Sequence, residues 1–179
     1  MDHDEDVKLM LAFQQGDERA FDGLYRKHAP SLARYFWRLT FSTPLSEEMV
    51  QETFLKIHRY KASYQPRAGF KTYLYMVARS ILLNNWKGVR NARQEDELDG
   101  DGVAADDGPL DDVLSRRETL RHVQDALAEL PERQASALLL VRSEGMSYED
   151  AARALEMSVP ALKSLLNRAR NQLIEKVLP

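Results

Sequence analysis

Cations and aromatic rings are concentrated between residues 56 and 93, and this combination suits nucleic acid. The segment holds nine Lys or Arg residues and no Asp or Glu. Its aromatic residues are Tyr60, Tyr64, Phe70, Tyr73, Tyr75 and Trp86. Cations attract a phosphate backbone, and exposed aromatic faces stack on unpaired bases. The segment predicts contact with single-stranded or locally opened nucleic acid; the alternative is a solvated basic helix whose aromatics are core.

A second nucleic-acid candidate lies in residues 147–170, whose layout is typical of a helix-turn-helix. Ser147 and Ser158 each precede a helical pattern that they can cap, and Asp150 is placed for the reciprocal bond of a capping box. The polar side of the second helix carries Lys163, Ser164, Asn167 and Arg168. These residue types bind base edges and phosphates in a major groove. We weigh DNA binding above the alternative, an ordinary helical hairpin with a polar outer face.

The sequence has few residue patterns that would indicate catalysis or metal binding. The chain has no Cys, which removes disulfides and thiolate metal sites. Its four His residues, His3, His28, His58 and His122, do not have metal-ligand spacing. Neither a nucleophile motif nor a Gly-rich phosphate loop is present. We therefore expect a protein that is not an enzyme and needs no cofactor or metal.

Charge is divided along the chain in a way that the net charge of −3 hides. Residues 1–94 have a net charge of +5, residues 95–112 of −9 and residues 113–179 of +1. The middle segment also has three Gly and one Pro, so it buries too little apolar surface to offset its chain entropy. We predict two domains, 1–94 and 113–179, joined by a flexible acidic linker, and hypothesise that the linker competes with nucleic acid for the basic surface.

Helical periodicity dominates both domains, and no segment alternates convincingly as a strand, so the predicted fold class is all-α. In the first domain we expect helices over 6–15, 17–40, 46–60 and 70–89, with Pro30 bending or restarting the second one. The third helix has two distinct faces. Val50, Phe54 and Ile57 should be core. The other face is either a solvated flank or a surface for a partner, and it consists of Glu48, Gln51, Glu52 and Leu55.

Membrane insertion and secretion are not expected. No apolar run approaches the roughly 20 residues that span a bilayer, and the N-terminal residues are acidic, unlike a signal peptide. We expect a cytoplasmic protein.

Four segments, in order, resemble the extracytoplasmic-function (ECF) sigma factors of bacterial RNA polymerase, members of the sigma-70 family. They are GDERAFDGLYRKHAP (16–30), EEMVQETFLKIHRY (47–60), AGFKTYLYMVAR (68–79) and the sequence from LPERQ to RNQL (130–173). The resemblance covers most of the chain outside the linker. It is most specific in VQETFLKI and in the pairing of the two domains.

The resemblance implies a role for each segment. In the first domain, Glu48, Gln51, Glu52 and Leu55 would face the clamp of the polymerase largest subunit. The loop with Tyr64, Arg67 and Phe70 would capture a base flipped from the −10 promoter element. The following helix would hold the non-template strand through Lys71, Thr72, Tyr73, Arg79 and Ser80. In the second domain, which would work near the polymerase flap, Lys163, Ser164, Asn167 and Arg168 would read the −35 element.

The sequence departs from the family pattern at several positions. Tyr73-Leu74 replaces the usual Trp-Leu, and Ser80 and Asn84 replace the usual Asn and acidic residue. Glu156 stands at the usual turn Gly, where a left-handed backbone costs a side chain about 1 kcal/mol. Leu165 replaces a usual Arg and removes a phosphate contact. These departures affect base preference and DNA affinity more than the overall role.

The resemblance also implies partners. They would be the core polymerase, promoter DNA and an anti-sigma protein, which could hold the factor at the membrane. One alternative remains, a stand-alone helix-turn-helix regulator, which should bind duplex DNA as a dimer without polymerase. That alternative does not explain why cations and aromatics crowd residues 56–93.

Overall fold

The computed structural model describes residues 2–90 and 121–177, and within these ranges it is helical with no strand. The predicted all-α class is confirmed. The predicted linker, 95–112, lies outside the described residues, as do the inner ends of both predicted domains. The main helices are α1 (Asp2–Gln14), α2 (Glu18–Thr40), α3 (Thr43–Arg59), η1 (Lys61–Ser63), α4 (Phe70–Asn84), α7 (Glu132–Arg142), α8 (Tyr148–Ala154) and α9 (Val159–Val177). Residues 86–90 and 121–128 are also helical.

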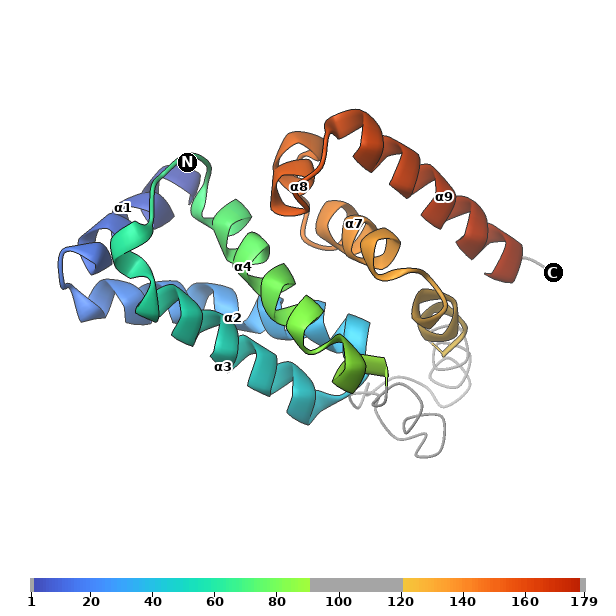
Figure 1. Cartoon of the computed structure of the whole chain (residues 1–179), viewed down its shortest axis with the longest axis horizontal. Coiled ribbons are helices and arrows are strands. Elements are labelled where there is room, and N and C mark those ends of the chain that lie inside the picture. The colour runs from blue at the N-terminus through green and yellow to red at the C-terminus, as the bar shows by residue number, and fades with distance from the viewer. Residues whose placement is uncertain (1, 91–120, 178–179) are drawn as a thin grey trace, which may run out of the picture.

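The first domain consists of α1 to α4, arranged side by side (Figure 1). Asp17 caps α2, accepting hydrogen bonds from the backbone N–H groups of Arg19 and Ala20. Ser42 caps α3 through the N–H of Leu45. Such caps satisfy N–H groups that have no partner inside the helix. The helices therefore begin where the sequence supplies a short oxygen-bearing side chain.

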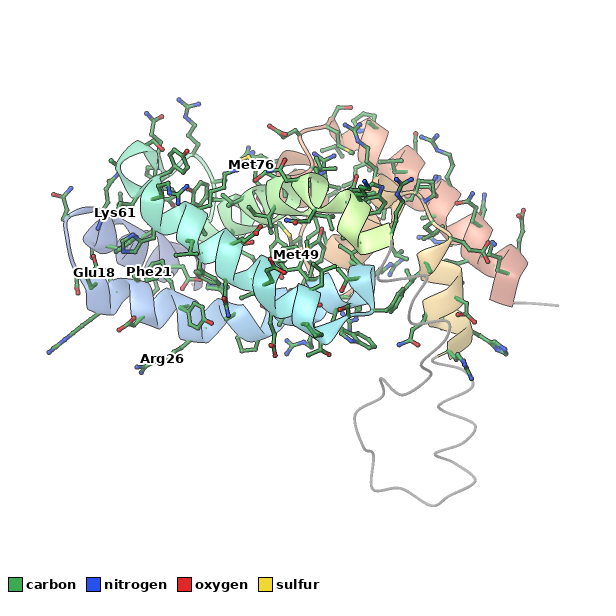
Figure 2. All side chains as sticks on the ribbon, turned by 60° about the horizontal axis from the view of Figure 1, so that its bottom comes forward. Glu18, Phe21, Arg26, Met49, Lys61 and Met76 are labelled. Atoms are coloured by element: carbon green, nitrogen blue, oxygen red, sulfur yellow. The ribbon has the colours of Figure 1, made fainter. Side chains whose placement is uncertain are left out.

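The core of this domain is aromatic as well as aliphatic. Phe13, Phe36, Phe70, Tyr35 and Tyr75 are at most 1% exposed. Figure 2 shows the interior filled between α2, α3 and α4, with Met49 pointing into it. Several aromatics of the basic segment are therefore core residues, as the alternative interpretation of that segment held.

Pro30 lies inside α2, and the helix continues through it from Glu18 to Thr40. Of the two outcomes expected at Pro30, a bend or a restart, the restart does not occur. A proline in a helix interior costs roughly 3 kcal/mol because it removes a backbone bond and crowds the preceding turn. Leu24 and Leu32 on either side of Pro30 are fully buried, and their packing offsets that local cost.

The connection from α3 to α4 is held against α1. The side-chain nitrogen of Gln14 lies 2.9, 3.2 and 3.1 Å from the carbonyl oxygens of Lys61, Ala62 and Tyr64, to which its two hydrogens are donated. Lys61 also lies over the ring of Phe13 at 4.3 Å, an attraction between a cation and an aromatic face. The N-terminal helix thus fixes the start of this loop.

The second domain contains the helix-turn-helix predicted from the caps. Ser147 Oγ accepts from the N–H of Asp150 at 3.1 Å, and Ser158 Oγ accepts from the N–H of Ala161 at 3.3 Å. In place of the predicted reciprocal bond to the backbone, Ser147 Oγ donates to the Asp150 carboxylate at 2.9 Å. Leu162 and Leu166 of α9 are buried against the rest of the domain.

The two domains contact each other. Helix α4 of the first lies beside α8 of the second, and α2 touches α7 (Figure 1).

None of the described helices is long and apolar enough to cross a membrane.

Candidate nucleic-acid and polymerase interface

One face of α3, which we call the docking strip, consists of Glu48, Gln51, Glu52 and Leu55. Glu48 and Gln51 are exposed, and Leu55 is 64% exposed. Glu52 is half-buried, and Asn85 donates a hydrogen bond to its carboxylate at 3.0 Å. A leucine this exposed among polar residues is available for contact with another protein.

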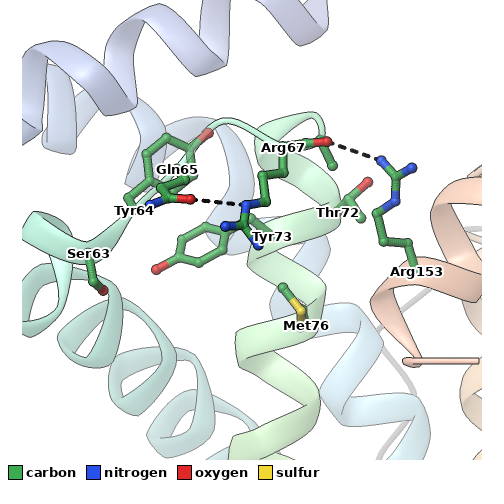
Figure 3. A pocket seen from close by; sticks show the side chains of 9 residues that line it. Ser63, Tyr64, Gln65, Arg67, Thr72, Tyr73, Met76 and Arg153 are labelled. Atoms are coloured by element: carbon green, nitrogen blue, oxygen red, sulfur yellow. Dashed lines mark hydrogen bonds between the residues drawn. The ribbon is translucent and has the colours of Figure 1, made fainter.

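The loop between η1 and α4 forms one wall of an open pocket of about 430 Å³ (Figure 3). Its wall includes Tyr64 and Tyr73, whose rings meet edge to face at 4.9 Å. Both phenols are neutral at physiological pH, and burial raises the pKa of each further above its ordinary value. Arg67 and Arg153 add two cations to the lining. A partly aromatic pocket of this size suits a flat organic ring, and a nucleobase is one.

The residues expected to hold a DNA strand, the strand face, run from this loop along α4. They are Tyr64, Arg67, Phe70, Lys71, Thr72, Tyr73, Arg79 and Ser80. Phe70, Thr72 and Tyr64 are buried at 0%, 1% and 4% exposure, and Arg79 is 7% exposed. Arg67 is exposed, while Lys71, Tyr73 and Ser80 are half-buried. The strand face is therefore largely covered in this arrangement of the chain.

The second domain covers Lys71 and Arg79 of the strand face. Lys71 Nζ donates to the backbone oxygen of Glu144 at 2.5 Å. Arg79 Nε lies 3.5 Å from the Glu132 carboxylate, and Arg79 Nη1 lies 4.0 Å from that of Glu156. Two cations predicted to hold DNA thus face carboxylates or carbonyls of the other domain.

The outer side of α9 carries a third surface, the reading row, made of Lys163, Ser164, Asn167 and Arg168. All four residues are exposed. The Lys163 ammonium lies 5.8 Å from the ring of Tyr148, and Arg168 Nε donates to the backbone oxygen of Ser164 at 3.4 Å. The row is brought together as predicted and is open to a partner.

Comparison with known proteins finds two family models on the chain. The model "Sigma-70 region 2" matches residues 24–92, and "Sigma-70, region 4" matches residues 120–173. The RNA polymerase sigma-H factor of Pseudomonas aeruginosa is 31% identical over 98% of this chain and 94% of its own length. The chain belongs to the ECF sigma factors of the sigma-70 family.

Other relatives agree with this membership. The ECF RNA polymerase sigma-E factor of Haemophilus influenzae is 31% identical over 97% of this chain and 96% of its own length. The sigma factor RpoE of Bartonella quintana, solved with the anti-sigma factor NepR, superposes with a TM-score of 0.63 at 27% identity, covering 88% of this chain and 96% of that one. CnrH, solved with the cytosolic domain of CnrY, has the same fold, with a TM-score of 0.73 at 23% identity and 96% of each chain covered.

ECF sigma factors initiate transcription by directing RNA polymerase to promoters, and this chain is a member of that family. The stand-alone regulator is not favoured, because a region 2 match accounts for the cations and aromatics of the first domain. The two regions also match in the order that the resemblance implied.

Several residues that line or support these surfaces in the sigma factor were not predicted from the sequence. Met76 and Arg153 line the pocket, and Figure 3 shows Arg153 reaching the loop from the second domain, where it donates to the backbone oxygen of Arg67 at 3.2 Å. Lys56 donates to Ser80 at 2.9 Å. These partners are distant in sequence, so no local pattern identified them. Glu156 had been noted only for its backbone, which indeed has a left-handed φ of 53°.

Proposed function

We propose that this sigma factor uses its three surfaces on three parts of one initiation complex. The docking strip binds the clamp of the polymerase largest subunit, the strand face holds the opened −10 element, and the reading row reads the −35 element. The observation that carries this proposal is the coexistence of two exposed surfaces on different domains, a polar row on a capped helix-turn-helix and a strip centred on Leu55.

The docking strip suits a protein partner. Its exposed Leu55 offers apolar area that a partner can remove from water. Glu48 and Gln51 supply a polar rim, which is the usual surround of an apolar contact. Glu52 is oriented by Asn85, so one polar group of the strip is held in place before the polymerase arrives.

The pocket beside Tyr64 and Tyr73 suits a single unstacked base. Extruding a base costs a few kcal/mol, and stacking on an aromatic ring returns about 1–3 kcal/mol. One pocket therefore stabilises an opened promoter without being able to open one alone. The −10 element is held once the polymerase fixes the sigma factor on the DNA.

The reading row suits duplex DNA. Lys163 and Arg168 are exposed cations five residues apart, about 1.4 helical turns, and Ser164 and Asn167 lie between them. Cations bind phosphates without regard to sequence, whereas hydroxyl and amide groups contact base edges. With both domains fixed by the polymerase, the second DNA contact becomes effectively intramolecular, which multiplies affinity. The sigma factor supplies no catalytic group and no cofactor; the polymerase supplies the chemistry.

Control by an anti-sigma protein is part of the proposal. The relative RpoE of Bartonella quintana was solved bound to such a protein. The docking strip and the reading row, two of the surfaces proposed to bind polymerase and DNA, are exposed to an inhibitor here. The protein would act in the cytoplasm, free or held near the membrane by that inhibitor.

Reconstituted transcription tests the function. Purified full-length protein is added to bacterial core polymerase, and transcription start sites are mapped on genomic DNA. Start sites that share two sequence elements at a fixed spacing, and that vanish without the protein, are expected. If the protein neither binds core polymerase nor changes where transcription starts, the proposal is wrong.

A further inference from the structure

A buried group of charges joins α1 to α2, apart from the three surfaces assigned above. Asp6 of α1 is 4% exposed and His28 of α2 is 6% exposed. The Asp6 carboxylate accepts a hydrogen bond from Lys27 Nζ at 2.8 Å and lies 2.8 Å from His28 Nε2. A buried carboxylate is costly unless it is paired and hydrogen-bonded. Asp6 therefore depends on both partners, and they attach α1 to α2.

The His28 imidazole fits this group only in its neutral form. An ionised carboxylate only accepts hydrogen bonds, so His28 Nε2 carries the proton that is donated to Asp6. A charged imidazole has a second N–H, at Nδ1, and none of the described residues accepts a hydrogen bond from that atom. A charged His28 would also face two cations, Lys27 of α2 and Lys71 of α4.

Protonation of His28 is therefore coupled to breaking this contact. Burial and the two cations lower the pKa of His28 in the folded protein, against the opposite effect of Asp6. In an opened form the imidazole titrates near its ordinary pKa of about 6.5. The stabilisation by the neutral imidazole is complete above about pH 6.5 and declines as pH falls below that value. Acid thus favours the form in which Asp6 and His28 are apart.

A row of packed rings runs from His28 to the pocket beside Tyr64 and Tyr73. The ring centroids of His28 and Phe70 are 5.3 Å apart, and Phe70 is fully buried at the start of α4. The rings of Phe70 and Tyr73 follow at 6.3 Å, and those of Tyr73 and Tyr64 at 4.9 Å. Contiguous packed side chains of this kind carry coupling between sites. Displacing His28 removes a support of the rings that form the pocket wall.

Helix α1 gives a second connection to the same pocket. It lies against both α2 and α4 (Figure 1). Asp6 and Gln14 are eight residues apart on this helix, and the Gln14 amide bonds to three carbonyl oxygens of the loop before the pocket. Loss of the contact at Asp6 therefore loosens the helix that anchors the loop.

We propose that the contact between Asp6 and His28 is a pH-sensitive switch: at neutral pH it holds α1 on α2 and keeps the pocket formed, and in acid it breaks and the pocket loosens. The switch itself stands without the proposed function. Its consequence rests on that function, because the step that it regulates is capture of an unstacked base. Acid should then lower the output of the sigma factor.

Methionine methyl signals of the full-length protein, followed by NMR, test the switch. Met10 of α1 is fully buried, Met76 lines the pocket, and Met49 is fully buried in the core of the first domain (Figure 2). Titration from about pH 7.5 to about pH 5.5 spans the range in which histidines titrate. The Met10 and Met76 signals should shift together, at the midpoint of the His28 ring signals, and the Met49 signal should stay.

Two substitutions separate His28 from the other histidines. His28→Gln keeps an amide N–H that can donate to Asp6 at every pH, so the Met10 and Met76 shifts should disappear. The matched control, His122→Gln, removes an exposed histidine of the second domain and should keep both shifts. Thermal melting followed by circular dichroism checks that each variant is folded.

Transcription by the reconstituted holoenzyme tests the consequence. The measured quantity is the output of the unsubstituted protein divided by that of His28→Gln at the same pH, which cancels the pH response of the polymerase itself. The template is a promoter fragment taken from the start-site mapping. At the midpoint of the Met10 shift, half of the sigma factor has lost the contact, so this ratio should fall about twofold from its value at neutral pH.

Each result decides a different claim. Met10 and Met76 signals that stay in place, or that move together with Met49 as in global unfolding, overturn the switch, and the unsubstituted protein alone decides this even if His28→Gln does not fold. A switch that opens without any fall in the transcription ratio overturns its effect on the pocket. Failure to bind polymerase would instead overturn the proposed function, and the methyl signals would still report the switch.

Discussion

Leu55→Ala isolates the contribution of the docking strip to polymerase binding. The substitution removes three carbons from a residue that is 64% exposed in the free protein. Burial is worth about 0.8 kcal/mol per methylene-sized group, so covering the exposed part of these carbons contributes about 1.5 kcal/mol. That free energy corresponds to about a tenfold increase in the Kd for core polymerase.

Stability should hardly respond to the same substitution. An exposed side chain makes few contacts in the folded protein, and such substitutions change the free energy of unfolding by about 0.5 kcal/mol or less. A loss of binding without a loss of stability would therefore identify a contact surface and not a folding defect.

The assay is competition for core polymerase between labelled unsubstituted protein and each unlabelled variant. Leu83→Ala is the matched control, because Leu83 is also a leucine, is 45% exposed and lies on α4 outside the docking strip. It should bind within about twofold of the unsubstituted protein. Equal affinities for the two variants would refute the assignment of the docking strip.

Three other predictions concern the reading row, the core and pH. Lys163→Ala with Arg168→Ala should weaken binding to promoter duplex and lower the slope of log K against log salt by about 2, measured by salt titration. Leu74→Ala, at a fully buried position, should lower the free energy of unfolding by about 2–5 kcal/mol in urea melts. Burial lowers the pKa of His28 from its ordinary value, outweighing the hydrogen bond to the Asp6 carboxylate, which raises it. Below its ordinary pKa, His28 therefore binds a proton in the unfolded chain that it does not bind in the folded chain, so the free energy of unfolding should fall as pH falls below about 6.5. Urea midpoints measured across this pH range should show that dependence in the unsubstituted protein and lose it in His28→Gln.

Local features of the fold could be predicted because their causes are local. Asp17, Ser147 and Ser158 cap helices as expected, since a cap needs only one side chain and the next turn of backbone. The restart allowed at Pro30 does not occur, for the opposite reason. Its local penalty is real, but burial of residues from other helices outweighs it, and a local pattern does not contain those contacts.

The candidate site likewise has features that could be predicted from the sequence and features that could not. The reading row lies on one exposed face because helical spacing alone decides that. The cover over Arg79 comes from Glu132 and Glu156, which are more than 50 positions away in the chain. A count of cations in residues 56–93 identified the partner chemistry, yet it could not tell which cations are already paired or which aromatics are core.

The Gln14 bridge has a practical consequence for anyone who shortens this protein. The region 2 family model begins at residue 24, which invites a fragment cut there. That cut would discard Met10 and Phe13, both fully buried, together with the amide that anchors three carbonyls ahead of the pocket. Fragments for crystallography or screening should retain the first helix, because without it the loop that shapes the pocket loses its anchor.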